Sequence, residues 1–420
     1  MGRIKEWFLR TIWNRLLLLA RWLVISIVTG LVLGVVGAAF AKSIAWVTVY
    51  RKANPMILAG LPLAGLLIVF FYHFERKDEK SSTNLVLDAI HAERHIPFRT
   101  APLIFASTII THLFGGSAGR EGAALQLGGS IGEQLGKLFH MDQADQRVTI
   151  MCGMSAAFSA LFGTPLAAAI FPMEVVSVGI MHYAALVPCV VAALIASAVA
   201  ASLGVEAEAF VLGELPALTA GIGARVVVLG VLCAAVSILF CVVIHRTEHE
   251  LERIFPNPYL RIGAAGAVLA LMTFLCGTTD YLGAGMDVAG RYIAGEVVAE
   301  AFLLKILFTA VTLGGGFKGG EIVPTFFVGA AFGSLMGSVL GLPCGLSAAC
   351  GMAAVFCGVT NCPISSLLIS LEMFGFQGAL FFALVISISY MQSGYYGLYH
   401  SQRIVYAKDK TRFINQKTKE

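Results

Sequence analysis

Charged side chains are scarce in this chain of 420 residues. Asp, Glu, Lys and Arg make up 13% of it, against about 25% in a typical soluble domain. Hydrophobic residues make up 58%, and the mean hydropathy is +0.82. A single soluble domain cannot bury that much apolar surface, which argues against a soluble enzyme. The net charge of +4 is also too small to indicate binding to nucleic acid.

Cysteine pairs with metal-binding spacing are absent as well. The nine cysteines lie in apolar stretches, and no two of them form a CxxC motif. This pattern disfavours both a zinc site and a disulfide framework. We therefore predict buried thiols, and we expect no metal and no cofactor.

Several stretches lack charge over the length of a membrane-spanning helix. Residues 322–402 contain one charged side chain, Glu372, and residues 101–119 and 175–205 contain none. Because a spanning helix needs about 20 apolar residues, the chain has room for roughly ten such segments. We predict an all-α polytopic membrane protein, since a membrane β-barrel would show short alternating segments instead.

Basic residues gather at both ends of the chain. Five of them precede or enter the first apolar segment, between residues 3 and 21, and six more lie within residues 403–419. The positive-inside rule then predicts that both termini are cytoplasmic and that the number of crossings is even. Residues 1–14 combine an apolar face with basic residues, which is typical of a helix at the membrane interface. We expect a multi-pass protein of the plasma (inner) membrane of a bacterium.

The chain contains an internal repeat. Gly153–Phe158 resembles Gly351–Phe356, 198 residues later, and a proline and a glutamate follow both copies at the same spacing. The glycine-rich segment 115–121 recurs 200 residues later at 315–321, and each copy ends in a glutamate. Segments rich in glycine and alanine can match by chance, but the paired glutamates favour two homologous halves. The predicted organisation is an interfacial helix (1–14), a first membrane repeat (15–205), a connecting region and joint (206–261), the remainder of a second repeat that begins near residue 220 (262–402), and a cytoplasmic tail (403–420).

Each half has a glycine-rich interruption of an apolar segment. Gly115–Gly122 contains four glycines in eight positions. We therefore predict a loop that opens into a helix at Glu121, and the same design at Gly314–Pro324. Two broken helices with their N-termini aimed at one point would form an anion site, because free N–H groups and the positive dipole ends lie there. Tight helix packing through small residues is the alternative, but it does not explain the glutamate in each loop.

Ionisable residues inside a membrane are costly and are candidates for function. As a carboxylate, Glu121 could occupy the anion site itself. Once protonated, it could turn away and admit an anion, which would couple anion movement to proton movement. A salt bridge with Arg120 that only holds the loop is the alternative. Glu321 could contribute to the site or cap the helix that it starts. For Glu174 and Glu372 we favour a structural role at helix ends.

These motifs resemble, in the same order, those of the CLC chloride channel and transporter family. Gly119–Gly122 looks like the Gly-Arg-Glu-Gly signature of that family, and Gly319–Pro324 resembles its Gly-Gly-Ile-Phe-x-Pro motif. Ala157–Glu174 resembles its proton-pathway helix, and Gly397–Tyr399 resembles the segment with its anion-binding tyrosine. The resemblance covers nearly the whole chain. It implies the CLC fold, an antiparallel homodimer whose subunits each have two inverted-topology halves and broken helices that meet at a central anion site.

The departures from the family pattern point to one of its branches. Ser81–Val86 replaces the first motif, Gly-Ser-Gly-Ile-Pro, and puts Thr83 in the position of the central anion-binding serine. Glu321 replaces an isoleucine. Val175 stands where chloride/proton exchangers of the family commonly have a second, internal proton glutamate. This set resembles the bacterial CLC-type fluoride/proton antiporters.

The resemblance also implies the site residues. Glu121 would be the proton-coupled gate. The anion would be bound by Thr83, Asn84, Arg120, Gly122, Ala123, Glu321, Ile322 and Tyr399, with Ser82 as the alternative to Thr83. Fluoride is small and strongly hydrated, so its site must replace the water shell with strong hydrogen-bond donors. Hydroxyl groups, backbone N–H groups at the helix starts and a protonated glutamate would supply such donors.

We therefore expect a secondary active fluoride/proton antiporter that exports fluoride from the cytoplasm. Its partners would be fluoride, protons, membrane lipid and a second copy of the chain. A chloride/proton antiporter or a passive anion channel of the same fold is the main alternative, because composition does not show which anion binds. A membrane-embedded enzyme or scaffold is disfavoured. His112 and His182, the histidines of the central apolar runs, have no Cys or Asp placed beside them, and we interpret both as structural.

Overall fold

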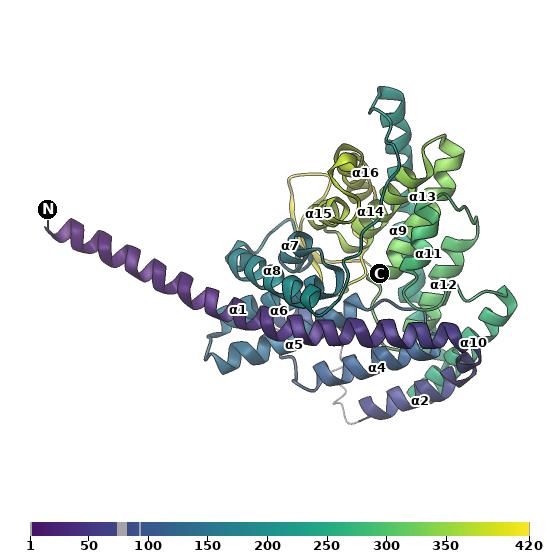
Figure 1. The fold of residues 1–420 in the computed structure, drawn as a ribbon, viewed down its shortest axis with the longest axis horizontal. Coiled ribbons are helices and arrows are strands. Elements are labelled where there is room, and N and C mark those ends of the chain that lie inside the picture. Colours follow the sequence, from purple (N-terminus) through teal and green to yellow (C-terminus); the bar gives the residue numbers. More distant parts are fainter. Residues whose placement is uncertain (1, 74–81, 92–93, 420) are drawn as a thin grey trace.

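The structure, a computed structural model, describes residues 2–73, 82–91 and 94–419, with the backbone alone for residues 2–10. Ser81, the first residue of the segment that replaces the first family motif, lies outside the described residues. Helices make up most of the molecule (Figure 1), as predicted. The nine cysteines are free thiols, and seven of them are buried.

Within the described residues, the α-helices form two sets of eight. The first set is α1 (Gly2–Ala53), α2 (Leu61–Tyr72), α3 (Thr83–Ile90), α4 (Thr100–Phe114), α5 (Glu121–Leu138), α6 (Gln143–Phe162), α7 (Pro165–Val175) and α8 (Leu186–Ser202). The second set is α9 (Ala220–Ile254), α10 (Pro258–Cys276), α11 (Met286–Ile293), α12 (Ala301–Gly314), α13 (Ile322–Leu340), α14 (Cys344–Thr360), α15 (Pro363–Phe374) and α16 (Ala379–Gln392). Short 3₁₀ turns at Pro55–Gly60, Tyr183–Ala185 and Phe376–Gly378 lead into α2, α8 and α16.

The two sets repeat both in order and in packing. α1 packs against α6 and α8, and α9 packs against α14 and α16 in the same way. α5 lies along α6 and α13 along α14, with glycines at both contacts. An ideal Cβ on Gly128 would lie 2.3 Å from the carbonyl oxygen of Gly153, and one on Gly329 would lie 2.4 Å from that of Gly351. The repeat seen in the sequence is thus a repeat of packed helices, and small residues set the closeness of the contacts.

Both glycine loops interrupt the chain of helices where the sequence predicts. α4 ends at Phe114 before α5 begins at Glu121, and α12 ends at Gly314 before α13 begins at Ile322. Gly115 (φ 95°) and Gly316 (φ 103°) turn the chain in the left-handed region of backbone conformation, which glycine adopts without a steric penalty. The two halves therefore break at equivalent places, and the left-handed glycine comes one residue later in the second half.

The lengths of the helices differ from the expectation of roughly ten full spans. Within the described residues, six helices are long and apolar enough to cross a membrane, and six further apolar helices are shorter. The shorter group includes α4 and α7 in the first half and α12 and α15 in the second. Glycine loops and prolines divide the apolar stretches, so a count based on composition alone overestimates the full-length spans.

Both ends of the chain differ in part from the prediction. α1 runs without a break from Gly2 to Ala53, so no separate helix ends at residue 14. The tail forms β2 (Arg403–Tyr406) and β3 (Phe413–Lys417), and β2 also pairs with β1 (Ser177–Val178) in a three-stranded sheet. Ile404 and Val405 are buried, so apolar contacts dock the tail on the body. The membrane body is all-α, and this small sheet is added to it.

Two glutamates join the halves through reciprocal helix caps. Near the end of α7, Glu174 accepts hydrogen bonds from the backbone N–H groups of Ile364 (2.9 Å) and Ser365 (2.8 Å) in the first turn of α15, and from the Ser365 hydroxyl (2.6 Å). Near the end of α15, Glu372 accepts from the N–H groups of Leu166 and Ala167 in the first turn of α7, both at 2.9 Å. Each carboxylate satisfies N–H groups that have no partner within their own helix. These contacts agree with the structural role that we favoured for both residues.

Removal of either carboxylate should destabilise the fold. A hydrogen bond to a charged group contributes about 1.5–3 kcal/mol, so Glu372→Ala should lower the apparent unfolding temperature in detergent by several degrees. Glu174→Ala should lower it further, because Glu174 is more deeply buried and accepts a third hydrogen bond. Glu214→Ala, a change to an exposed residue between α8 and α9, should leave the temperature unchanged. Equal shifts in all three variants would contradict the capping role.

Candidate anion site

The two glycine loops pair with each other at the centre of the molecule. The N–H of Gly119 donates to the carbonyl oxygen of Gly320, and the N–H of Gly320 donates to that of Gly119, both at 2.7 Å. The contact leaves no room for side chains. An ideal Cβ on Gly320 would lie 2.4 Å from the backbone nitrogen of Gly122, and one on Gly319 would lie 2.4 Å from the Cβ of Ala118. Glycine at these positions is therefore a steric requirement of the pairing.

Three helix starts converge beside this pair. An ideal Cβ on Gly122, in the first turn of α5, would lie 3.1 Å from Oε2 of Glu321 and 3.5 Å from Oγ1 of Thr83. Glu321 directly precedes α13, and Thr83 is the first residue of α3. The first N–H groups of a helix have no acceptor within the helix and carry partial positive charge. The arrangement thus directs three positive helix ends toward one region, as an anion site requires.

A cavity of about 360 Å³ opens on this region. It is lined by Thr83, Asn84, Gln126 and Glu321, by the C-terminal turns of α9, and by residues on either side of Tyr399. Three buried atoms, Oε1 of Gln126, Oε2 of Glu321 and the hydroxyl oxygen of Tyr399, have no hydrogen-bond partner within the described part of the chain. Buried polar groups normally have partners. A set of unpartnered donors and acceptors next to three helix N-termini is typical of a site for a small hydrated ion.

Glu121 is fully buried and is held by its neighbour in sequence. Its Oε2 accepts from the backbone N–H of Arg120 at 2.9 Å, and its Oε1 lies 3.3 Å from the Arg120 Nε. The same guanidinium group donates to Oε1 of Glu208 (2.7 Å) and to the carbonyl oxygen of Leu161 (3.2 Å). The salt bridge that the sequence offered as an alternative therefore exists. It compensates the buried charge of a carboxylate that also lies against the paired loops.

A second cavity, of about 320 Å³, lies on the other side of Arg120. It is lined by Arg120, Glu208 and His112, by the C-terminal turns of α1 and by the start of α11. The first cavity is lined by the C-terminal turns of α9 and the start of α3. These are equivalent elements of the two halves. The internal repeat thus produces two related cavities, and the paired loops with Glu121 lie between them.

The structure brings together most of the predicted site residues. Some contribute side chains, and others belong to the first turns of helices. Thr83 and Glu321 line the first cavity, and Tyr399 lies in the chain between two residues that line it. Gly122, Ala123 and Ile322 belong to the first turns of α5 and α13. Ser82 is occupied as the cap of α3, where its hydroxyl accepts from the N–H of Leu85. This favours Thr83 over Ser82 as the hydroxyl of the site.

Two predicted residues have side chains that are bound to other partners. The Arg120 side chain lines the second cavity and is bound to the two glutamates and Leu161. Asn84 lines the first cavity, but its Oδ1 accepts from the N–H of Ser401 at 3.1 Å. Two further residues of this region were not predicted: Gln126, whose Nε2 lies 3.4 Å from Oγ1 of Thr83, and Glu208, which binds Arg120. Each belongs to a segment without a motif, so only the fold shows where its side chain goes.

His112, interpreted as structural, is also part of this region. Its Nε2 lies 3.4 Å from the carbonyl oxygen of Gly119, and its own carbonyl oxygen accepts from Nη1 of Arg51 at 2.7 Å. It therefore links the glycine loop to the end of α1. Both contacts agree with a supporting role.

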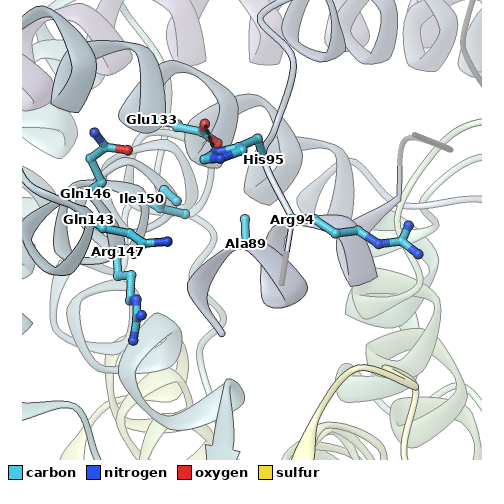
Figure 2. Close-up of a pocket in the computed structure, with 8 residues that line it drawn as sticks. All are labelled: Ala89, Arg94, His95, Glu133, Gln143, Gln146, Arg147 and Ile150. Atoms are coloured by element: carbon cyan, nitrogen blue, oxygen red, sulfur yellow. Dashed lines mark hydrogen bonds and ion pairs between the residues drawn. The ribbon is translucent and has the colours of Figure 1, made fainter. Parts of the chain in front are cut away.

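A smaller cavity of about 70 Å³ (Figure 2) shares no lining residue with the first or the second cavity. Its buried acid, Glu133, accepts from Nδ1 of His95 (3.2 Å), from the N–H of Ile96 (2.7 Å) and from Nζ of Lys137 (2.6 Å). These contacts fix the segment before α4 against α5. We assign Glu133 a structural role, because the contacts already satisfy its carboxylate.

Comparison with known sequences agrees with this geometry. Residues 63–394 match the family described as Voltage gated chloride channel. The chain belongs to this family. It is 36% identical over 397 residues to the chloride/fluoride channel protein of Pseudomonas syringae pv. tomato, a match that covers 93% of this chain and 88% of that protein. It is 25% identical over 388 residues to the H(+)/Cl(-) exchange transporter ClcA of Cronobacter sakazakii, with 84% and 81% covered.

Solved structures of the CLC family have the same fold. A CLC-type fluoride/proton antiporter superposes with a TM-score of 0.88 at 34% identity, covering 91% of this chain and 98% of that one. A slow cyanobacterial Cl-/H+ antiporter superposes with a TM-score of 0.74 at 20% identity, covering 89% and 94%. The predicted CLC fold is therefore confirmed. Members of this family are ion channels and transporters. The chain is therefore an anion transport protein of the membrane.

Gly320→Ala tests the steric requirement of the paired loops. The added Cβ would meet the α5 backbone, so we expect a loss of folded, monodisperse protein on size-exclusion chromatography and an unfolding temperature lowered by many degrees. Gly213→Ala is the matched control, because a Cβ there has no atom within 4 Å, and it should behave as the wild type. A normal Gly320→Ala protein would mean that the loops can separate without cost.

Proposed function

We propose that this protein is a secondary active fluoride/proton antiporter that exports fluoride from the cytoplasm. The observation that carries the proposal is the placement of Glu121, a fully buried carboxyl group that lies between two related cavities where helix N-termini converge. A group in this position can exchange a proton with either side as it moves. No catalytic residue is required, because nothing covalent forms or breaks except the bond to that proton.

The contacts of Glu121 support a gate. As a carboxylate it is held by Arg120, and its negative charge opposes an anion near the same helix starts. Protonation removes that charge and weakens the attraction to Arg120. The neutral side chain is then free to turn from the paired loops and leave the positive helix ends to an anion. Proton movement and anion movement are thus coupled at the same place.

The chemistry around the first cavity favours fluoride. Dehydrating fluoride is costly, and strong donors must offset that cost. The hydroxyls of Thr83 and Tyr399 and the first N–H groups of α5 and α13 are such donors. Glu321 has an unpartnered Oε2 in this region and, when protonated, would donate an O–H to the anion. The similarity to a fluoride/proton antiporter and to a chloride/fluoride channel protein supports the same choice.

We also propose the orientation and the assembly. With both termini cytoplasmic, in a bacterial inner membrane, the end of α1 puts the second cavity outside and the end of α9 puts the first cavity inside. The apolar residues Val187 and Leu194 of α8 and Leu380 of α16 are exposed on the single chain. Membrane lipid and a second copy of the chain, as in the homodimer expected for this family, would cover such surfaces.

Anion selectivity distinguishes the proposal from its alternatives. Purified wild-type protein in liposomes should release fluoride much faster than chloride, with protons moving in the opposite direction. Thr83→Ser should keep transport and reduce the preference for fluoride, because the smaller side chain loosens the site. Ion-selective electrodes give both rates. Chloride release at the fluoride rate in the wild type would support a chloride/proton antiporter, and release without proton movement would support a passive channel.

Glu121→Gln tests the gate itself. The amide has nearly the same shape but cannot take up or release the proton, so proton uptake driven by a fluoride gradient should fall to the level of empty liposomes, as read with a pH dye. Fluoride movement should stop or become a passive leak. Glu214→Gln, the same change at an exposed position, should transport as the wild type. Full proton coupling in Glu121→Gln would leave Glu121 as a structural partner of Arg120 and would point to Glu321 as the proton carrier.

A further inference from the structure

The C-terminal turns of α9 carry a row of titratable side chains. His245, Glu248, His249 and Glu252 follow one another at intervals of three, one and three residues, which places them on one face of a helix. All four line the first cavity. The equivalent turns of α1 line the second cavity with Arg51 and Lys52 instead. The repeat thus keeps the backbone arrangement, while the charge of the two entrances differs.

The row begins at the anion site and ends at the surface. The backbone of Glu248 packs on the end of α12, where an ideal Cβ on Gly314 would lie 3.0 Å from the Glu248 nitrogen. Nε2 of His245 lies 3.2 Å from the carbonyl oxygen of Leu398, the residue before Tyr399. Its buried Nδ1 has no hydrogen-bond partner among the described residues. Glu248 and His249 are exposed, so the row spans the depth of the cavity.

Carboxylates at the entrance of the first cavity do not favour the entry of an anion. Glu248 and Glu252 lower the local concentration of fluoride at the entrance to its own site, because like charges repel. Glu252 is partly compensated by Arg261, whose Nη1 lies 2.9 Å away. Lys318, a cation of the cavity wall, lies over the ring of Tyr72 at 4.5 Å. Carboxylate and imidazole groups are, however, suited to exchanging protons with water near neutral pH.

We propose that His245, Glu248 and His249 form the proton route between the water of the first cavity and Glu321 and Glu121. This inference rests on the proposed function. A proton from bulk water binds Glu248 or His249, passes through the cavity to His245 or Glu321, and reaches Glu121 at the paired loops. In the opposite direction each group returns its proton to water. The position of the internal proton glutamate of chloride/proton exchangers is taken by the apolar Val175 here, and the α9 row supplies titratable groups from a different helix. The remaining titratable group that faces this row in the cavity is His400.

The test is the double variant Glu248→Gln/His249→Gln, reconstituted in liposomes. Fluoride efflux is measured with an electrode near neutral pH, at low and at high concentration of a membrane-impermeant zwitterionic buffer on both sides, at constant ionic strength. Because coupled efflux needs a supply of protons, we expect the rate at low buffer to fall several-fold below that of the wild type. High buffer concentration should restore it, since buffer molecules in the cavity can replace the missing groups.

Glu250→Gln is the matched control. It removes the same charge from the same helix, but Glu250 does not line the cavity and is paired with Arg253. Its efflux should match the wild type at both buffer concentrations. A double variant as fast as the wild type or faster would overturn the proposal and leave the carboxylates as repelling charges only. A slow double variant without recovery in buffer would also overturn it, in favour of a structural role.

The wild-type measurement separates this proposal from the one it rests on. If wild-type efflux is not coupled to protons, the proposed antiport function fails. If it is coupled and the double variant behaves as the wild type, antiport stands and only the route through α9 fails.

Discussion

The two hydrogen bonds between Gly119 and Gly320 are the constraint on which the rest of the site depends. Within a membrane every backbone N–H and C=O needs a partner inside the protein, and a helix that stops midway leaves such groups open. Here the two interruptions satisfy each other. The pairing puts the starts of α5 and α13 side by side and requires glycine where a Cβ would meet backbone. It also sets both loop glutamates next to one another.

The repeat explains why there are two cavities, and its imperfections explain why they differ. Equivalent helices line both, but the residues at equivalent positions have different charges. Arg120 has Gly320 as its counterpart. Glu121 therefore has a guanidinium partner, whereas Oε2 of Glu321 has none among the described residues. Beside the same paired loops, the fold thus provides one carboxyl group that is paired with a guanidinium group and one whose Oε2 has no hydrogen-bond partner among the described residues.

The four glutamates of the repeat show how environment divides identical side chains between structure and function. Glu174 and Glu372 each accept from two backbone N–H groups at the start of a helix in the other half. Their oxygens are satisfied, and they connect α7 with α15. Glu121 depends mainly on its sequence neighbour. A carboxyl group with such local contacts can move without unpairing helices, which a helix cap cannot do.

The sequence by itself determined the class of the protein, its repeat and its main motif. Scarce charge indicates a membrane protein, the offset of about 200 residues relates the two halves, and the glycine-rich segments 115–119 and 315–320 interrupt the helices of both halves. For the same local reasons Glu121 and the loop before it could be located from the sequence, since both depend on residues adjacent in the chain. Thr83 came from resemblance to the family, and its closeness to Gly122 agrees with that prediction.

Only the tertiary structure decided which distant residues share the site. Glu208 reaches Arg120 because the connection after α8 passes α6, where its N–H donates to the carbonyl oxygen of Phe162. Gln126 meets Thr83 because α3 packs on α5. The tail docks through Ile404 and Val405 although it reads as a short basic extension. These contacts join segments that carry no motif. Hydrophobic periodicity predicts which face of a helix is buried, but it does not predict which other segment packs against that face.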